Sequence, residues 1–374
     1  MFGRNYKTKS SETVLHLISC GADPKQTDIY GNTALIYAIL QNNEDSVHLL
    51  LNLGLDPNQR QNSGALPFDF AKNRGNEYLM RLLGPLTHGI TRTDLELIII
   101  KHKESSLREK FNSFVLCLAR IIVLLAVFST ILYAYPQYIL YYLPKTPSDI
   151  AFHILFFVLN AFIWISWYKT CGSDPGYLPT NTAKYKKVLD SKVESGLHFQ
   201  TFGKRVRDPY EDIRLCHTCR TVQSNRSTHC RFCKRCTASF DHHCIYLSTC
   251  IGQNNRLWFF SLGVNMFLLG SLTAYKIIVF AQSNGTVFQP YHWFNMCFGF
   301  QFTFIGFCLT LCNIRRAAIN LTQNEEFKSR RYSYLTDSEG RFVNPFDRGS
   351  YFRNIFEYFT TKRYNYSKMD TYDC

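Results

Sequence analysis

The stretch Cys216–Cys250 reads CHTCRTVQSNRSTHCRFCKRCTASFDHHCIYLSTC and holds seven of the chain's 14 cysteines together with four histidines. Disulfide frameworks belong to oxidising compartments, whereas Cys-x2-Cys pairs mixed with His on a cytosolic loop favour zinc. Two tetrahedral structural zinc ions need eight Cys or His ligands, and eleven are present, so three are left over. The arithmetic alone does not say which three. Because this polar loop has little core of its own, metal binding is expected to supply its folding energy.

Within this stretch, Asp241-His242-His243-Cys244 offers a catalytic arrangement as well as metal ligands. A cysteine is nucleophilic as its thiolate, and an adjacent imidazole can take the thiol proton. A carboxylate can then fix the tautomer of the imidazole and stabilise its charged form. Asp, His and Cys this close in sequence cannot share a helical face, so the sequence predicts a turn that brings them together. A structural zinc module without catalysis is the alternative.

Long apolar runs elsewhere in the chain predict membrane-spanning helices, because about 20 apolar residues cross a hydrocarbon core. The second of these runs is aromatic at both ends, which is typical of anchors at the membrane interface. A further half-span at Tyr135–Leu143 leaves a six-span arrangement open. The four predicted spans cover roughly residues 112–133, 149–167, 257–281 and 291–312.

The chain has a net charge of +14, and its Lys and Arg residues cluster beside the apolar runs, which indicates the orientation of the spans in the membrane. Lys and Arg are dense from Lys169 to Arg256 and again after Asn313, whereas the short loops near Lys145 and at 283–290 carry almost none. Cytosolic flanks are enriched in Lys and Arg, so four spans place both termini and the Cys/His loop in the cytosol. The polar N-terminal residues predict no signal peptide. A zinc-dependent nucleic-acid binder is excluded because the cluster lies between membrane spans.

Two charged residues, Arg120 and Lys276, fall inside apolar runs. Charges within a membrane are functional candidates, and the alternative is that each side chain snorkels to an interface. Asn284-Gly285-Thr286 is a glycosylation sequon on the predicted lumenal side. It agrees with the predicted topology, although such triplets are frequent by chance.

The N-terminal region repeats itself with an offset of 33 residues. Gly21–Pro24 recurs as Gly54–Pro57, and Gly31–Ala38 recurs as Gly64–Ala71. This is the ankyrin period, in which a Gly-bearing turn is followed by paired helices. About two and a half units fit before Gly84, whereas about three are needed for stability. The array is therefore predicted to be a short form, or to dock its exposed end on something else.

With these features the sequence resembles the DHHC-type palmitoyltransferases, named for the motif that stands here at Asp241–Cys244. The resemblance runs from about residue 111 to the C-terminal region, and the family's cysteine-rich pattern is met at every position. It implies Cys244 as the acyl-accepting nucleophile and His242 as general base. Asp241 then orients His242, and His217 is left as a bystander. The resemblance also implies two structural zinc ions, the first held by Cys216, Cys219, His229 and Cys236 and the second by Cys230, Cys233, His243 and Cys250.

Three shorter motifs agree with the family in their order and in their distance from the spans. Asp174-Pro175-Gly176 follows the second span, as the family's Asp-Pro-Gly does. Thr322–Glu325 follows the fourth span in the place of the family's Thr-Thr-x-Glu, with Gln in the second position. Asn344–Phe346, Gly349 and Asn354 resemble the C-terminal element in which the Asn packs against the catalytic part.

The sequence departs from the family pattern directly after the motif. Ile245-Tyr246 stands where most members have Pro-Trp, and Leu247-Ser248-Thr249 replaces the usual small and Asn residues. In the family these residues border the acyl-chain entrance, so the departures bear on rate or on chain-length preference. A Tyr can still present an aromatic face with a polar tip at the membrane interface.

The resemblance implies a protein S-acyltransferase that works by ping-pong transfer. Cys244 takes a fatty acyl group from palmitoyl-CoA, the donor, and passes it to a cytosolic cysteine of a protein substrate. The acyl chain is expected among the four helices, and the anionic CoA against basic residues. The rival function is an acylation-incompetent adaptor, in which Ile245 and Tyr246 mark relaxed chemistry.

The layout is similar to the huntingtin-interacting subfamily, in which ankyrin repeats precede the DHHC part and recruit substrates. The resemblance implies a multi-pass protein of the Golgi or endoplasmic reticulum membrane. The expected fold is mainly α, a four-helix transmembrane bundle with a zinc-bound cysteine-rich cytosolic domain and a short N-terminal ankyrin array. The predicted segments are 1–90 ankyrin repeats, 91–110 linker, 111–168 the first two spans, 169–256 the zinc domain, 257–313 the last two spans and 314–374 the cytosolic C-terminal region.

Overall fold

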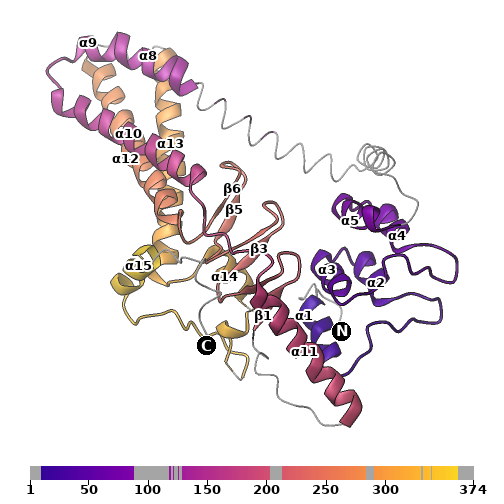
Figure 1. The fold of residues 1–374 in the computed structure, drawn as a ribbon. Helices are drawn as coiled ribbons and strands as arrows, with labels where there is room; N and C mark the ends of the chain where they lie inside the picture. Colours follow the sequence, from indigo (N-terminus) through magenta and orange to yellow (C-terminus); the bar gives the residue numbers. More distant parts are fainter. Residues whose placement is uncertain are drawn as a thin grey trace, which may run out of the picture. The chain divides into compact units, whose positions relative to one another are not determined.

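The structure is a computed structural model of the whole chain, drawn in Figure 1. It describes residues 10–87, 118, 121, 125, 129–202, 213–283, 290–329, 332–337 and 339–360. Contacts divide the chain into two compact units, each of which is described by itself. The first unit comprises Met1–Val115, Leu178–Ser224 and Asn365–Cys374, and the second comprises Leu116–Tyr177 and Asn225–Tyr364.

The N-terminal part of the first unit is an ankyrin array of one helix followed by two helix pairs. Asn43 and Asn76 cap the second and fourth of the paired helices by accepting a backbone N–H with the side-chain oxygen. Gly31 has a φ of +78°, and a Cβ there would lie 2.9 Å from the Asn62 backbone nitrogen. Gly64, the equivalent residue of the next repeat, has a φ of +86°, so the left-handed backbone that both positions share accounts for the repeated glycine. The helices are α1 (Ser10–Ser19), α2 (Ala34–Leu40), α3 (Glu44–Asn52), α4 (Pro67–Arg74) and α5 (Glu77–Leu83).

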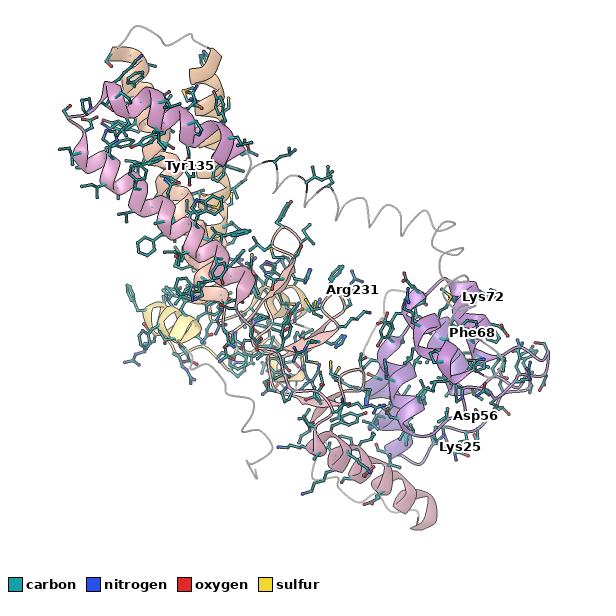
Figure 2. The ribbon with its side chains drawn as sticks, turned by 45° about the horizontal axis from the view of Figure 1, so that its top comes forward. Lys25, Asp56, Phe68, Lys72, Tyr135 and Arg231 are labelled. Atoms are coloured by element: carbon teal, nitrogen blue, oxygen red, sulfur yellow. The ribbon has the colours of Figure 1, made fainter. Side chains whose placement is uncertain are left out.

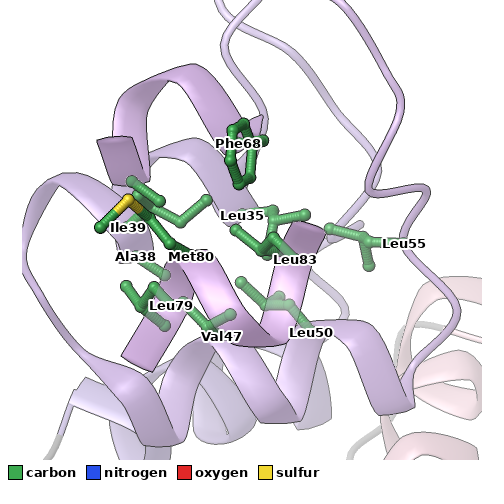
Figure 3. Packing of buried hydrophobic residues seen from close by; sticks show 11 residues of the cluster. Leu35, Ala38, Ile39, Val47, Leu50, Leu55, Phe68, Leu79, Met80 and Leu83 are labelled. Carbon is green, nitrogen blue, oxygen red and sulfur yellow. The ribbon is translucent and has the colours of Figure 1, made fainter. Parts of the chain in front are cut away.

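Apolar side chains at helical spacing build the core of the array, as the close-up in Figure 3 shows. Leu35 and Ile39 of α2 lie one turn apart on one face of that helix and meet Val47 and Leu50 of α3. The loops project from these helices, and Figure 2 labels Lys25 and Asp56 in two of them.

The array packs against two further elements of the first unit. Helix α11 (Ala183–Phe202) and the hairpin of β1 (Arg214–Cys216) and β2 (Thr221–Gln223) lie against α1 and α3. Their shared buried cluster is made of Leu15, Leu49, Tyr185, Val188, Leu189, Leu215 and Val222. Of the two alternatives predicted for the array, a short form or an exposed end that docks elsewhere, the structure shows docking of its α1 and α3 face within the first unit.

Long apolar helices dominate the second unit. Among the described residues, three helices are long and apolar enough to cross a membrane: α10 (Ile150–Gly172), α12 (Arg256–Ser283) and α13 (Pro290–Ala318, apolar from Asn295). They run side by side in Figure 1. A Cβ at Gly306 would lie 2.4 Å from the Phe267 backbone nitrogen, so glycine permits close packing of α12 and α13.

These helices correspond to the last three predicted spans. The first predicted span, 112–133, lies mostly outside the described residues, so a four-helix bundle is not confirmed. Arg120 and the Asn284 sequon also lie outside them. Lys276, the other charged residue within an apolar run, forms an ion pair with Asp149 at 2.6 Å. Asp149 is the residue that precedes α10, so the Lys276 charge has a partner in the protein.

The predicted half-span at Tyr135–Leu143 is part of a helical segment that precedes α10. It consists of η2 (Thr130–Ala134), α8 (Tyr135–Gln137), η3 (Tyr138–Tyr142) and α9 (Leu143–Lys145). Tyr135, labelled in Figure 2, donates its hydroxyl to Asn160 Oδ1 at 2.9 Å and accepts from Trp164 Nε1 at 2.6 Å. These bonds fix the segment against α10.

Among the described residues of the second unit there are also two hairpins and three short helices. The hairpins are β3 (Thr228–Cys230) with β4 (Arg235–Thr237), and β5 (His242–Cys244) with β6 (Thr249–Ile251). The helices are α14 (Gln323–Lys328), η5 (Ser333–Leu335) and α15 (Tyr351–Thr360).

Candidate functional site

The Asp241–Cys244 motif opens the β5–β6 hairpin. Successive side chains of a strand point to opposite faces, so His242 and Cys244 share one face and His243 takes the other. The antiparallel register pairs His243 with Cys250, a residue of the same predicted zinc set. Strand alternation therefore separates the side chains predicted to be catalytic, His242 and Cys244, from the predicted metal ligand His243. The prediction that a turn joins Asp, His and Cys was wrong.

Asp241 is buried, and both of its carboxylate oxygens have hydrogen-bond partners. Its Oδ2 accepts from His242 Nδ1 at 2.8 Å, and its Oδ1 accepts from the Gln323 backbone N–H at 2.7 Å. The Tyr358 hydroxyl lies 3.4 Å from the same Oδ1. Burial raises the pKa of the Asp241 carboxyl, but the bond and charge of His242 outweigh it, so the net pKa is lowered. The side chain is a carboxylate that holds the His242 ring in one orientation.

The pKa of His242 is raised to about 9. Burial lowers this pKa, while hydrogen bonding to Asp241 and to Cys244 raises it more strongly. His242 therefore has the basicity to take a proton from the thiol. Its ring also meets the Phe259 ring edge to face, with centroids 5.4 Å apart.

Cys244 lies against an apolar wall. Its side chain is 8% exposed and packs with Ile251 of β6 and Phe259 of α12. Leu309 of α13 and Leu247 of the hairpin turn border the same cluster. The thiol thus sits where the hairpin meets two apolar helices, near the start of α12.

The second predicted zinc set comes together within the second unit. Cys230, Cys233, His243 and Cys250 present donor atoms that all lie within 4.8 Å of one another. His243 Nδ1 is 3.4 Å from Cys233 Sγ and 3.8 Å from Cys250 Sγ. Zinc–sulfur bonds of about 2.3 Å and zinc–nitrogen bonds of about 2.0 Å in a tetrahedron require separations of this size. Phe232 stacks on the His243 ring with centroids 4.7 Å apart. The donor set fits zinc.

The first predicted set is divided between the two units, so its halves are described separately. In the first unit, Cys216 ends β1 and Cys219 lies in the turn, where its N–H points to Cys216 Sγ at 3.4 Å. In the second unit, His229 and Cys236 face each other across β3 and β4. Each half presents two candidate ligands from a hairpin, and a structural zinc site takes four Cys or His ligands in all.

The three hairpins repeat each other with a period of 14 residues. Cys216, Cys230 and Cys244 end their first strands in the same register. Arg220, Lys234 and Ser248 all have φ near +50° in the turns. Leu247 stands where the other hairpins carry Cys219 and Cys233. Cys244 therefore occupies a ligand position whose Cys-x2-Cys partner is absent, which gives a structural reason for the free thiol.

The Asp174-Pro175-Gly176 motif forms a turn that contacts the residues directly after β6. Asp174 Oδ1 accepts the Gly176 and Tyr177 backbone N–H groups, which closes a turn. A Cβ at Gly252 would lie 2.4 Å from the Pro175 carbonyl oxygen. The motif thus fixes the residues that follow β6.

The Thr322–Glu325 motif begins α14 with a capping box, in which Thr322 and Glu325 satisfy each other's backbone N–H groups. The Gln323 backbone N–H, not its side chain, reaches Asp241, so the Gln departure leaves this contact intact. Glu325 also forms a buried ion pair with Arg226 at 2.9 Å.

We expect Glu325→Ala to destabilise the second unit by about 3–5 kcal/mol, because it leaves the Arg226 guanidinium buried without its partner. Thermal unfolding of the detergent-solubilised protein should shift down by several degrees. Glu339→Ala is the matched control, since Glu339 pairs with Arg341 at an exposed site. Equal shifts for both variants would contradict the importance of the buried pair.

The C-terminal motif fixes α15 so that it contacts Asp241. Asn354 donates to the Ala318 carbonyl at 2.8 Å and accepts the Arg348 N–H at 2.8 Å. It is 2% exposed, and it places Tyr358, one turn later, against Asp241. Sequence reasoning missed Tyr358, and no motif around it could have marked it.

Comparison with known proteins identifies the class of protein. A model of the DHHC palmitoyltransferase family matches residues 210–330, and a model of ankyrin repeats in three copies matches residues 5–94. The chain therefore contains a DHHC palmitoyltransferase domain preceded by ankyrin repeats, which confirms the resemblance.

Individual relatives combine the same parts. The chain is 23% identical to palmitoyltransferase ZDHHC17 of Danio rerio and 22% identical to that of Homo sapiens, in both cases over 95% of its length. It is 31% identical to palmitoyltransferase ERF2 of Candida glabrata over 34% of its length. The chain covers 64%, 63% and 37% of these three relatives, respectively. Together with the three candidate spans, these relatives indicate a membrane protein.

Proposed function

We propose that this chain is a protein S-acyltransferase in which Cys244 carries a fatty acyl group from acyl-CoA, such as palmitoyl-CoA, to a cysteine of a protein substrate. The observation that carries the proposal is the hydrogen-bonded Asp241–His242 pair on the same strand face as Cys244. The names of the relatives agree with this activity.

In the first step His242 takes the proton of Cys244, and the thiolate attacks the thioester carbonyl of acyl-CoA. A Cys244–acyl bond forms, the bond from the acyl carbon to the CoA sulfur breaks, and CoA leaves as a thiol with the proton held by His242. In the second step His242 accepts the proton of the substrate thiol, which attacks the acyl-enzyme. The substrate thioester forms, and Cys244 leaves with the proton returned.

The surroundings of Cys244 suit a long acyl chain. Phe259 and Leu309 belong to helices that can cross a membrane, so a chain attached at Cys244 can extend along apolar side chains. Each CH2 that leaves water contributes about 0.8 kcal/mol. The chain's net charge of +14 favours the anionic CoA head.

We propose that two zinc ions shape this region, one held by each predicted ligand set. When bound, each zinc supplies structural cross-linking of hairpins and no reactive group. The set Cys230, Cys233, His243 and Cys250 has the donor geometry for this. Since Cys216 and Cys219 resemble Cys230 and Cys233 in the hairpin repeat, the first set is proposed by the same logic.

We propose that both termini and the cysteine-rich region face the cytosol and that the protein resides in the Golgi or endoplasmic reticulum. The distribution of Lys and Arg supports the orientation. The segment boundaries predicted from the sequence stand as part of this proposal. The ankyrin array is proposed to recruit substrates with cytosolic cysteines, because stacked repeats present extended binding surfaces.

The test is incorporation of the acyl group of an alkynyl palmitoyl-CoA into the purified full chain, with zinc measured on the same sample. We expect labelling of the parent that hydroxylamine removes and no labelling of Cys244→Ser. Both proteins should contain about two zinc ions per chain. Labelling unchanged in Cys244→Ser, or absent from the parent, would favour the acylation-incompetent adaptor.

A further inference from the structure

One surface of the ankyrin array is occupied by the segment that carries the first Cys-x2-Cys pair. Leu15 of α1 and Leu49 of α3 are buried against Leu215 and Val222 of the β1–β2 hairpin. In the 14-residue repeat these two hairpin positions correspond to His229 and Cys236, which are predicted zinc ligands. The two positions that carry predicted zinc ligands in the second hairpin therefore carry apolar residues that pack against the array in the first hairpin.

The turn between Cys216 and Cys219 is held by a carboxylate of the array. Asp45 Oδ1 accepts from the His217 N–H at 2.9 Å, from the Thr218 N–H at 3.1 Å and from the Thr218 hydroxyl at 3.2 Å. Its Oδ2 accepts from Ser11 Oγ at 2.7 Å. Cys216 Sγ lies 3.8 Å from the same Oδ1, so the three donors of the turn offset the negative charge beside the sulfur.

A second link joins the same parts. Asn52 donates to the Tyr185 hydroxyl at 3.1 Å, and that hydroxyl lies 2.9 Å from His217 Nδ1. His217, which was predicted to take no part in metal binding or catalysis, is 1% exposed and is a buried structural residue of this contact. Two points of the turn are thus fixed from the array and from α11.

We infer that Asp45 is a positioning residue for the metal-binding turn Cys216–Cys219, so that the ankyrin array builds half of a zinc site. Hydrogen bonds to a charged acceptor are stronger than neutral ones, and three of them converge on one carboxylate oxygen. The turn is therefore ordered before metal binds. The α1–α3 face of the array is not free for a substrate, which has to use other surfaces of the repeats.

The inference rests on the proposed zinc ligation and is independent of acyl transfer. Its test compares the full-length parent with Asp45→Ala, measuring zinc release to a chelator and amide hydrogen exchange of the 213–223 segment. Asp45→Asn keeps an acceptor oxygen and is expected to fall between the two. Asp69→Ala is the control, because Asp69 caps α4 of the array and makes no described contact with the turn.

Asp45→Ala is expected to release one zinc at least about tenfold faster, which corresponds to about 1.4 kcal/mol. The amides of His217 and Thr218 should lose protection, while Asp69→Ala leaves both properties as in the parent. Unchanged exchange in Asp45→Ala, or an equal loss in Asp69→Ala, would overturn the inference. A parent with fewer than two zinc ions would refute the zinc assignment instead, and the amide comparison would still decide the role of Asp45.

Discussion

His242→Ala is expected to slow formation of the acyl-enzyme by a factor on the order of 10²–10⁴, the usual contribution of a positioned general base. The reason is geometric, since His242 shares a strand face with Cys244 and is held by Asp241 at 2.8 Å. Single-turnover labelling with an alkynyl acyl-CoA, quenched over time, measures the rate.

Asp241→Asn tests whether the negative charge of Asp241 beside His242 is needed. The amide can still accept from the Gln323 N–H, but it cannot balance a charged imidazole, so the rate should fall while the zinc content and the unfolding temperature stay near those of the parent. His48→Ala, in the array, is the control for loss of a histidine outside the Asp241–Cys244 motif. A His242→Ala rate within a factor of about two of the parent would rule out its role as the base.

Cys250→Ala is expected to remove one zinc per chain and to disorder the β5–β6 hairpin. The apparent binding free energy of a structural zinc is about 10–16 kcal/mol, far more than a hairpin of this size gains from its own contacts. Because His243 is both a proposed ligand and the neighbour of His242, acyl labelling should be lost together with the metal. Metal analysis and labelling of the same preparation measure both losses.

Cys308→Ala provides the matched control, since Cys308 is an exposed cysteine of α13 outside both ligand sets. It should change neither zinc content nor labelling. If Cys250→Ala kept about two zinc ions per chain, the second ligand set would be wrong even if catalysis failed.

Much of the fold was predictable where a single local signal dominates. Apolar runs long enough to cross a hydrocarbon core predicted α10, α12 and α13, and the glycine of each ankyrin turn predicted the repeats. Helix α11 was not predicted, because its apolar residues are few and Tyr185 and Val188 are buried only through contact with the array. Such tertiary burial leaves no clear pattern in a single helix.

The site was predictable to a similar extent. Spacing and resemblance marked Asp241, His242 and Cys244, and the structure brings these three together. The 14-residue repeat, visible in the sequence, would also have separated Cys244 from the ligands, since Leu247 breaks its Cys-x2-Cys pair. Asp45 could not have been found, because its partners lie about 170 residues away and no motif surrounds it.

The most direct test of acyl transfer through Cys244 is a chase experiment. The full chain is labelled with a traceable palmitoyl-CoA, freed of CoA and excess donor, and then mixed with a cysteine-containing substrate peptide. The acyl group should leave Cys244, located by peptide mass analysis, and appear on the peptide thiol at the same rate and in equal amount. A peptide that is labelled only while acyl-CoA is present, with the Cys244 adduct unchanged, would contradict an acyl-Cys244 intermediate.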